Sequence, residues 1–210
     1  MEIGIIGAGR MGRALGRHWA RAGHDVSISF SRDRHKLERV ARDLGGGTRA
    51  TTPADAARLA EAILFAVPWS NLDEALTQAG SLAGKVVLSC TIPMTADDSA
   101  LAIGHTTSGA EELAKRTGAS VVAIFDTITS ELIAADAAIA RATPDVVYCG
   151  DDDGAKSVAA TLARDAGFNP IDAGALHVAR YLEPFGLLVA QLAYEQELGE
   201  TLAYRFVLPT

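Results

Sequence analysis

The chain has 210 residues, of which 49% are hydrophobic and 21% charged, a composition typical of a globular protein long enough to bury a core. Its net charge of −7 and its lack of a basic run argue against a nucleic-acid partner. No apolar stretch approaches the ~20 residues that span a bilayer, the first residues do not form a secretory signal, and two cysteines are too few for a disulfide framework, so we expect a cytoplasmic protein with no membrane partner.

Short apolar runs alternate with helical patterns along the chain, as in successive β-α-β units. Strands are predicted at residues 2–6, 25–30, 62–67, 85–89, 120–125 and 145–148, and helices at residues 10–22, 34–44, 53–59, 71–79, 109–116, 130–140 and 154–166. Continuously apolar runs such as residues 63–67 are typical of strands covered on both faces. The sequence therefore predicts an α/β fold, a Rossmann-type doubly wound and mainly parallel sheet.

The first predicted strand is followed by the pattern G-x-G-x-x-G, which opens the first helix. The pattern comprises Gly7, Ala8, Gly9, Arg10, Met11 and Gly12. In this context Gly7 allows a tight turn, Gly9 lets a pyrophosphate approach the backbone, and Gly12 lets helix and strand pack closely. The free N–H groups of the helix N-terminus attract phosphate. The pattern predicts a dinucleotide site.

The end of the second strand indicates which dinucleotide is bound. An NAD site places an acid there to bind the ribose hydroxyls, but this chain has Ser31 and Arg32, with Lys36 beyond them. A hydroxyl and a guanidinium suit a 2′-phosphate, and residues 1–50 carry a net charge of +5 while the rest carries −12. Asp33 is expected to cap the next helix. We therefore predict NADP(H).

Two later loops follow strands whose carboxyl ends border the same crevice in a doubly wound sheet. The first contains Val67, Pro68 and Trp69, and the second contains Thr91, Ile92 and Pro93. These residues are predicted to bracket the nicotinamide. Trp69 serves either as a flat face for the ring or as core packing, and the sequence leaves both open.

Other polar motifs have structural explanations. Ser108 and Glu111 have the spacing of a capping box, and Asp151 to Asp153 fit a strand-to-helix turn better than a metal site, because no histidine lies nearby. We predict no metal. His105 is a possible proton donor, although a lone loop histidine is more often structural or solvated.

Residues 175–197 are almost continuously apolar and helical, with Pro184 expected to kink or split the helix. Tyr181, Phe185, Leu188 and Leu192 fall on one helical face. We predict an NADP-binding Rossmann domain at residues 1–148 and a small helical lobe at residues 149–210. The lobe packs on the nucleotide domain or forms a dimer interface, and plain core packing is the alternative for each side chain.

Several segments together resemble the F420-dependent NADP reductases. They are the glycine loop, Ser31-Arg32, Val67-Pro68-Trp69, residues 104–114 (GHTTSGAEELA), and in the tail residues 149–152, 172–174, 179–184 and 198–200. The resemblance covers nearly the whole chain. It implies hydride transfer between NADPH and the deazaflavin coenzyme F420, and a homodimer.

By the same resemblance, NADP(H) contacts residues 8–11, Ser31, Arg32, Lys36, Trp69 and the loop at residues 91–93. The deazaflavin contacts residues that follow the strand at 120–125 and a turn near the C-terminus; these are Phe125, Thr127, Thr129, Gly199 and Leu202. Many relatives have Lys-Ala-Phe-Asn where this chain has Ala-Ile-Phe-Asp at residues 123–126, and the loop at residues 90–94 also differs. Both departures fall where the second substrate is expected.

The expected function is therefore an NADP(H)-dependent oxidoreductase that exchanges hydride with F420. Such a reaction needs two stacked rings rather than an acid–base pair, so no catalytic residue is predicted. One alternative is an NADPH-dependent reductase of a small carbonyl, imine or flavin-like acceptor, with His105, His177 or Tyr181 as proton donor. A second alternative is a non-catalytic module that senses NADP(H).

Overall fold

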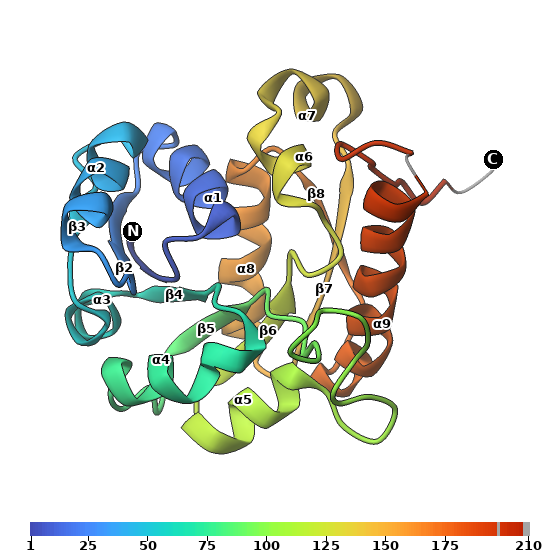
Figure 1. Ribbon diagram of the computed structural model, residues 1–210, viewed down its shortest axis with the longest axis horizontal. Helices are drawn as coiled ribbons and strands as arrows, with labels where there is room; N and C mark the ends of the chain where they lie inside the picture. Colours follow the sequence, from blue (N-terminus) through green and yellow to red (C-terminus); the bar gives the residue numbers. More distant parts are fainter. Residues whose placement is uncertain (197, 208–210) are drawn as a thin grey trace.

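The computed structural model describes residues 1–196 and 198–207, and within them eight strands form one sheet in the order β3-β2-β1-β4-β5-β6-β7-β8 (Figure 1). The strands are β1 (Glu2–Ile6), β2 (Asp25–Ser29), β3 (Arg49–Ala50), β4 (Ala62–Phe65), β5 (Val86–Ser89), β6 (Ser120–Ile124), β7 (Asp145–Gly150) and β8 (Asn169–Asp172). Neighbouring strands are parallel except β6 and β7, which are antiparallel. The predicted fold class is confirmed.

Helices cover both faces of the sheet. One face carries α1 (Arg10–Arg21), α2 (Arg34–Leu44) and α8 (Asp153–Asp165), and the other carries α3 (Pro53–Leu59), α4 (Leu72–Ala79), which follows the 3-10 turn at Trp69–Asn71, and α5 (Gly109–Thr117). The central strands show why they are apolar throughout: in β4, Leu64 packs in one core, while Ile63 and Phe65 pack in the other.

The prediction of a single helix at residues 130–140 is wrong, because the structure has two helices there. They are α6 (Ser130–Ala134) and α7 (Asp136–Ala142), and the chain leaves helical geometry at Ala135, where φ is −95° and ψ is 72°. The first of them packs against α1.

The order of the strands reverses direction at β1. From β1 the chain continues outward on one side through β2 and β3, and then returns to β4 on the other side and continues through β5 and β6. In open α/β sheets the crevice beyond the carboxyl ends of the strands at such a reversal is the usual ligand site. The fold therefore predicts a ligand site at the loops that follow β1 and β4.

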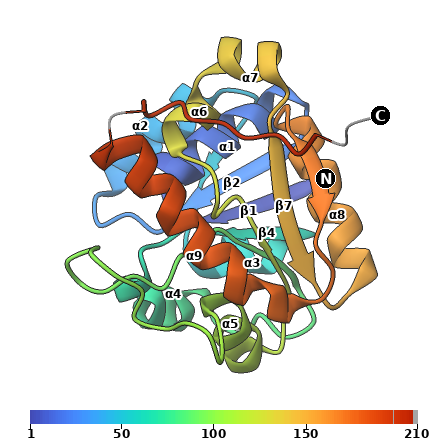
Figure 2. The ribbon, with the colours of Figure 1, turned by 90° about the vertical axis from the view of Figure 1, so that its right-hand side faces the viewer.

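The C-terminal helix α9 (Ala179–Ala190) runs through Pro184 without being split and continues as a π-helical segment, Gln191–Glu195. Of the two outcomes expected at Pro184, a kink or a split, the split is wrong. The backbone hydrogen bond that proline removes is offset by the burial of Leu182 before it and Val189 after it. Figure 2 shows α9 lying across the face of the molecule beside α5.

The predicted apolar stripe on this helix faces outward in part, because Phe185 and Leu192 are half-buried and the Phe185 ring packs edge-on against Tyr204. Tyr181 is 70% exposed and Leu188 is 49% exposed, whereas the side of α9 that packs on the protein carries smaller residues such as Ala179 and Gly186.

Two polar contacts attach α9 to α5. Glu183, which is 2% exposed, accepts hydrogen bonds from the backbone N–H groups of Gly109 (2.9 Å) and Ala110 (3.0 Å) at the start of α5. Arg180 donates two hydrogen bonds to Glu111, at 2.7 and 2.9 Å. A carboxylate at a helix N-terminus is favoured by the free N–H groups and the helix dipole.

The boundary expected between residues 148 and 149 lies inside β7, which pairs with β6 on one side and with β8 on the other. Residues 149–172 thus complete β7 and add α8 and β8 to the Rossmann sheet, and the separate C-terminal region begins after β8. In the part of the chain that the structure describes, no helix combines the length and hydropathy needed to cross a bilayer.

Gly186 allows α9 to lie directly on the loop that follows β6. A Cβ at this position would overlap the backbone carbonyl of Asp126 and would lie 2.9 Å from the Cδ1 atom of Ile92. The overlap with backbone cannot be relieved by a change of rotamer.

We predict that Gly186→Ala lowers the free energy of unfolding by about 1–3 kcal/mol, because overpacking forces the helix away from the loop. Gly154→Ala is the matched control, since its Cβ meets only a side-chain oxygen of Asp152 at 3.2 Å on the exposed first turn of α8. Urea denaturation of both variants measures the difference, and equal stability of the two would contradict the tight approach.

Candidate functional site

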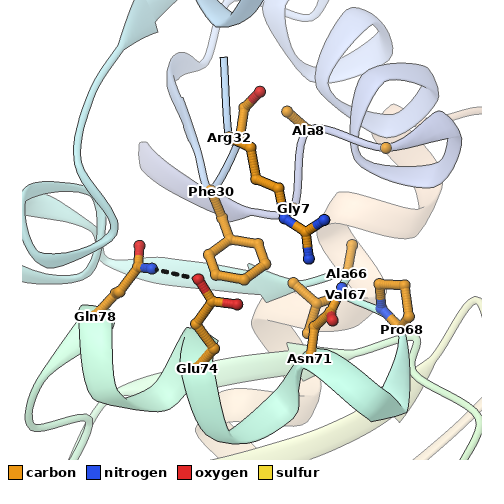
Figure 3. A pocket seen from close by; sticks show the side chains of 12 residues that line it. Gly7, Ala8, Phe30, Arg32, Ala66, Val67, Pro68, Asn71, Glu74 and Gln78 are labelled. Carbon is orange, nitrogen blue, oxygen red and sulfur yellow. Dashed lines mark hydrogen bonds between the residues drawn. The ribbon is translucent and has the colours of Figure 1, made fainter. Parts of the chain in front are cut away.

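A cavity of about 220 Å³ lies at the reversal of the strand order, beyond the carboxyl ends of β1, β2 and β4 (Figure 3). Its walls come from the glycine loop, the end of β2, the loop after β4 and one face of α4. The lining residues are Gly7, Ala8, Gly9, Phe30, Ser31, Arg32, Ala66, Val67, Pro68, Asn71, Glu74 and Gln78. We call this space the nucleotide cavity. Seven of the residues predicted for NADP(H) line it.

The glycine loop is shaped for a phosphate group. Gly7 has φ +128°, and a Cβ there would overlap the carbonyl of Ala66, so the loops after β1 and β4 meet at bare backbone. A Cβ at Gly9 would have no atom within 4 Å, which leaves open space at the start of α1. No side chain caps this helix, so its first N–H groups are free to bind an anion.

The positive charge of the nucleotide cavity comes from Arg32. Its guanidinium extends over the cavity toward Gly7 in Figure 3, and no ion pair of Arg32 is present among the described residues. Ser31 lies beside it and donates a hydrogen bond to the backbone carbonyl of Asp33 at 3.1 Å. Asp33 accepts a hydrogen bond from the N–H of Lys36, which lowers the pKa of Asp33 and confirms its predicted role as a helix cap.

The opposite wall contains residues that the sequence analysis did not single out. Asn71 ends the 3-10 turn before α4, Glu74 and Gln78 lie in α4, and Gln78 donates a hydrogen bond to Glu74 at 3.0 Å. Phe30 has a left-handed backbone (φ 62°) and places its ring in the cavity, as Figure 3 shows. These three polar residues are three and four positions apart, a spacing that places side chains on one face of a helix. This spacing in the segment after β4 could have identified them from the sequence.

A second cavity, of about 280 Å³, begins where the glycine loop ends. The start of α1, the loops after β5 and β6, and the C-terminal helical segment enclose it. The lining residues are Arg10, Met11, Cys90, Ile92, Asp126, Ile128, Thr129, Ser130, Gly186, Val189, Ala190 and Tyr194. We call this space the acceptor cavity. Its position on the other side of the glycine loop is where the second half of a dinucleotide and its redox partner would meet.

Asp126 is the buried acid of the acceptor cavity. It is 6% exposed, and its Oδ1 atom has no hydrogen-bond partner in the part of the chain that the structure describes. Burial raises the pKa of Asp126 to about 7, because desolvation disfavours the charged form more than the nearby backbone N–H groups favour it.

An ion-pair network joins three walls of the acceptor cavity. Arg10 at the start of α1 donates to Glu131 at 2.8 Å, and Tyr194 in the π-helical segment donates to the other oxygen of Glu131 at 2.7 Å. The hydrogen bond to Glu131 raises the pKa of Tyr194, although desolvation of its hydroxyl is the larger cause. The glycine loop, α6 and the C-terminal segment are thereby linked across the cavity.

The residues predicted to contact the deazaflavin lie in different surroundings. Thr129 lines the acceptor cavity and donates to the carbonyl of Glu200 at 2.5 Å, so the turn that holds Gly199 and Leu202 lies beside it. Thr127 is buried and shares a hydrogen bond of 2.6 Å with Tyr204.

Phe125 is fully buried in the core, edge-on to Trp19 and Phe168, with a left-handed backbone (φ 67°). Its ring does not line the acceptor cavity. Its backbone turns the chain sharply at the end of β6 and so positions Asp126, the next residue.

The other residues predicted to bind the cofactor fall into two groups. Arg10, Met11 and Ile92 line the acceptor cavity, whereas Gly12, Lys36, Trp69, Thr91 and Pro93 line neither cavity. The hydroxyl of Thr91 is used within the protein, where it donates to the carbonyl of Val67 at 3.0 Å and ties the two loops together. Trp69 is partly buried against the core on the α4 side.

The proton donors considered for a carbonyl substrate lie elsewhere, since His105, His177 and Tyr181 are exposed and line neither cavity. Asp152 caps α8, and Asp151 accepts from the N–H of Leu176, which confirms the turn predicted there. Ser108 caps α5 as expected. Among the described residues, no group of histidine, cysteine or acidic side chains has the arrangement of a metal site.

A family model described as "NADP oxidoreductase coenzyme F420-dependent" matches residues 2–93. Over these residues, which are less than half of the chain, the sequence is similar to that family. The matched segment includes the glycine loop, the Ser31-Arg32 pair and the loops after β4 and β5, so it contains most of the nucleotide cavity. The match supports an NADP-dependent oxidoreductase with NADP(H) as its cofactor.

Solved and curated relatives agree with this family. A protein of Arthrobacter sp. FB24, described as a candidate F420-dependent NADP reductase, is 25% identical, with a TM-score of 0.87 over 99% of this chain and 100% of that one. The metalloreductase STEAP3 of Rattus norvegicus is 29% identical over 187 residues, which are 89% of this chain and 36% of the relative. The chain thus spans about a third of the length of that relative.

A more distant solved structure shares the fold. The reductive aminase of Aspergillus terreus, in complex with NADPH and ethyl levulinate, has a TM-score of 0.62 and 18% identity over 90% of this chain and 60% of that one.

We predict that Arg32→Ala weakens NADPH binding by roughly 1–3 kcal/mol, because charge-assisted hydrogen bonds to the 2′-phosphate are lost. NADH, which lacks this phosphate, should be affected much less. Arg34→Ala is the control, since Arg34 is exposed on α2 and pairs with Glu38. Fluorescence titration with both dinucleotides gives the affinities, and an equal loss for NADH and NADPH would show that Arg32 does not bind the phosphate.

Proposed function

We propose that the protein transfers a hydride between NADP(H) and the deazaflavin coenzyme F420. The observation that carries this proposal is the pair of cavities that meet at the glycine loop, one beside Arg32 and the other under α9. The name of the matching family and the candidate reductase of Arthrobacter support the choice of F420.

The residues of the nucleotide cavity suit the adenosine half of NADP(H). The open backbone at Gly9 and the uncapped start of α1 would receive the pyrophosphate, and Arg32 with Ser31 would receive the 2′-phosphate. When bound, the cofactor supplies the hydride chemistry. The protein orients the ring and excludes water from it.

The acceptor cavity suits a flat, largely apolar ring. Met11, Ile92 and Val189 give it apolar walls, and α9 covers it. Stacked rings at near-attack distance gain most of their rate from such positioning. The walls agree with this requirement better than with a small polar substrate.

An NADPH-dependent reductase of an imine or carbonyl is the second candidate. It is favoured by one specific observation, the buried acid Asp126 in the acceptor cavity, because such substrates need a proton as well as a hydride.

Stopped-flow mixing of the protein with NADP⁺ and reduced F420 tests the first proposal. We expect coupled absorbance changes as NADPH and oxidised F420 form together, and NAD⁺ should support a much lower rate at the same concentration. No hydride transfer at saturating concentrations of both substrates would refute F420 as the partner.

We also propose that two copies associate through the outward face of α9, because Tyr181 and Leu188 are large, apolar and exposed there. Leu188→Glu should convert a dimer of 21.9 kDa subunits into monomers in sedimentation velocity. Leu59→Glu, at an exposed leucine at the end of α3, should leave the dimer intact. A wild-type protein that sediments as a monomer at high micromolar concentration would exclude this interface.

A further inference from the structure

The acceptor cavity contains an acid that the positioning of two stacked rings does not use. Asp126 follows β6, lines the cavity together with the end of the glycine loop, and has a carboxyl oxygen that is buried without a hydrogen-bond partner. A buried acceptor atom without a partner costs about 1–3 kcal/mol, and a carboxyl group costs more when it is charged. Such a group in a cavity is a candidate for proton transfer to a ligand.

The backbone around Asp126 holds it rigidly. Phe125 before it has a left-handed φ of 67° and is locked in the core by edge-on contacts with Trp19 and Phe168. From the other side, Gly186 of α9 lies against the carbonyl of Asp126 so closely that no Cβ fits. The side chain is therefore held at the wall of the cavity by strained and tightly packed structure, as is common for functional groups.

Among the described residues, no basic side chain forms an ion pair with Asp126. The titratable groups with an electrostatic interaction with Asp126 come from every element around it; they are Cys90 after β5, Cys149 in β7, Glu183 in α9 and Tyr204 in the C-terminal tail. All of these are neutral or negative. Arg10, the cation that lines the same cavity, is bound to Glu131. The surroundings therefore raise the pKa of Asp126 to about 7, so that both the protonated and the charged form are present at neutral pH.

We propose that Asp126 is a catalytic acid that gives its proton to the hydride acceptor. The acceptor is then a molecule in which the carbon that takes the hydride is joined or conjugated to a nitrogen or oxygen that takes a proton, a class that includes a deazaflavin ring, a cyclic imine and a ketone. This inference rests on the proposed redox function of the acceptor cavity.

NADPH, the acceptor and the Asp126 carboxyl group together supply every electron pair and proton that the reaction needs. The hydride and its electron pair pass from NADPH to the acceptor carbon, the double bond of the acceptor shifts its electron pair to the heteroatom, and the proton leaves the Asp126 carboxyl group for that heteroatom. The products are NADP⁺, the reduced acceptor and the Asp126 carboxylate, which regains a proton from water. In the opposite direction the carboxylate accepts the proton.

The pH dependence follows from these roles. Reduction of the acceptor uses the protonated form, so its rate should fall as the pH rises through about 7, the raised pKa of Asp126. Oxidation of the reduced acceptor uses the carboxylate, so its rate should rise over the same interval. If Asp126 had only a structural role, the rates of reduction and oxidation would not change with pH in opposite senses.

The main test compares wild type, Asp126→Asn and Asp145→Asn in single-turnover reactions of NADPH with oxidised F420, with a cyclic imine and with cyclohexanone. Asparagine keeps the shape of the side chain but has no acidic proton. We expect a loss of roughly 10²–10⁴-fold and a flat pH profile for Asp126→Asn, with NADPH affinity within about threefold of wild type. Asp145 is equally buried but hydrogen-bonded to Asn169 outside both cavities, so Asp145→Asn should react at the wild-type rate.

Two further measurements remove dependence on one variant. Formate should restore part of the rate to Asp126→Ala, because a small acid can enter the vacated space. In the protein without cofactor, the infrared difference between wild type and Asp126→Asn should contain the C=O band of a protonated carboxyl group near pH 6 that is lost near pH 9.

The outcomes separate the two proposals. If F420 is inert but the imine or ketone reacts and depends on Asp126, the F420 proposal fails and this inference holds. If F420 reacts equally fast with wild type and Asp126→Asn, the F420 proposal holds and the role of Asp126 as an acid is wrong. Absence of the carboxyl band near pH 6, or a wild-type protein that reduces none of the three acceptors, overturns the role of Asp126.

Discussion

A buried carboxyl group holds the C-terminal helix on the rest of the protein. Glu183 in α9 accepts two hydrogen bonds from the first N–H groups of α5, and it does so at 2% exposure, where desolvation raises its pKa to about 8. The N–H groups and the positive end of the α5 dipole offset part of that desolvation cost. With α9 fixed at this point, Gly186 one turn later meets the Asp126 loop. Every residue that α9 contributes to the acceptor cavity depends on this attachment.

The two cavities differ in the chemistry that they favour, and the difference follows from their construction. The nucleotide cavity lies between backbone loops of a doubly wound sheet, with the uncapped end of α1 and Arg32 as its positive groups, so it favours phosphates. The acceptor cavity lies between a loop and a packed helix, and its walls are mainly apolar. A hydride donor bound across the glycine loop would have its charged half in the first cavity and its reactive ring in the second, away from water.

Much of the fold could be predicted, and the misses have physical reasons. The apolar runs of β1, β4 and β5 and the capped starts of α2 and α5 are local signals, and the structure bears them out. Two strands were not predicted from the sequence: β3, which has two residues, and β8, which contains Pro170. Proline argues against a strand in the middle of a sheet, but β8 is the last strand, where one edge needs no partner.

The sequence by itself determined the loops that line the nucleotide cavity. The glycine loop acts through its own backbone, the Ser31-Arg32 pair acts through its side chains, and both follow short, strongly patterned strands. Only the tertiary structure decided the acceptor half. Asp126 is a buried acid because the end of β5, β7 and α9 pack around it. These segments lie between 36 residues before Asp126 and 60 residues after it in the sequence. Burial and the loss of water that shift a carboxyl group toward its protonated form are properties of that assembly, and no local pattern encodes them.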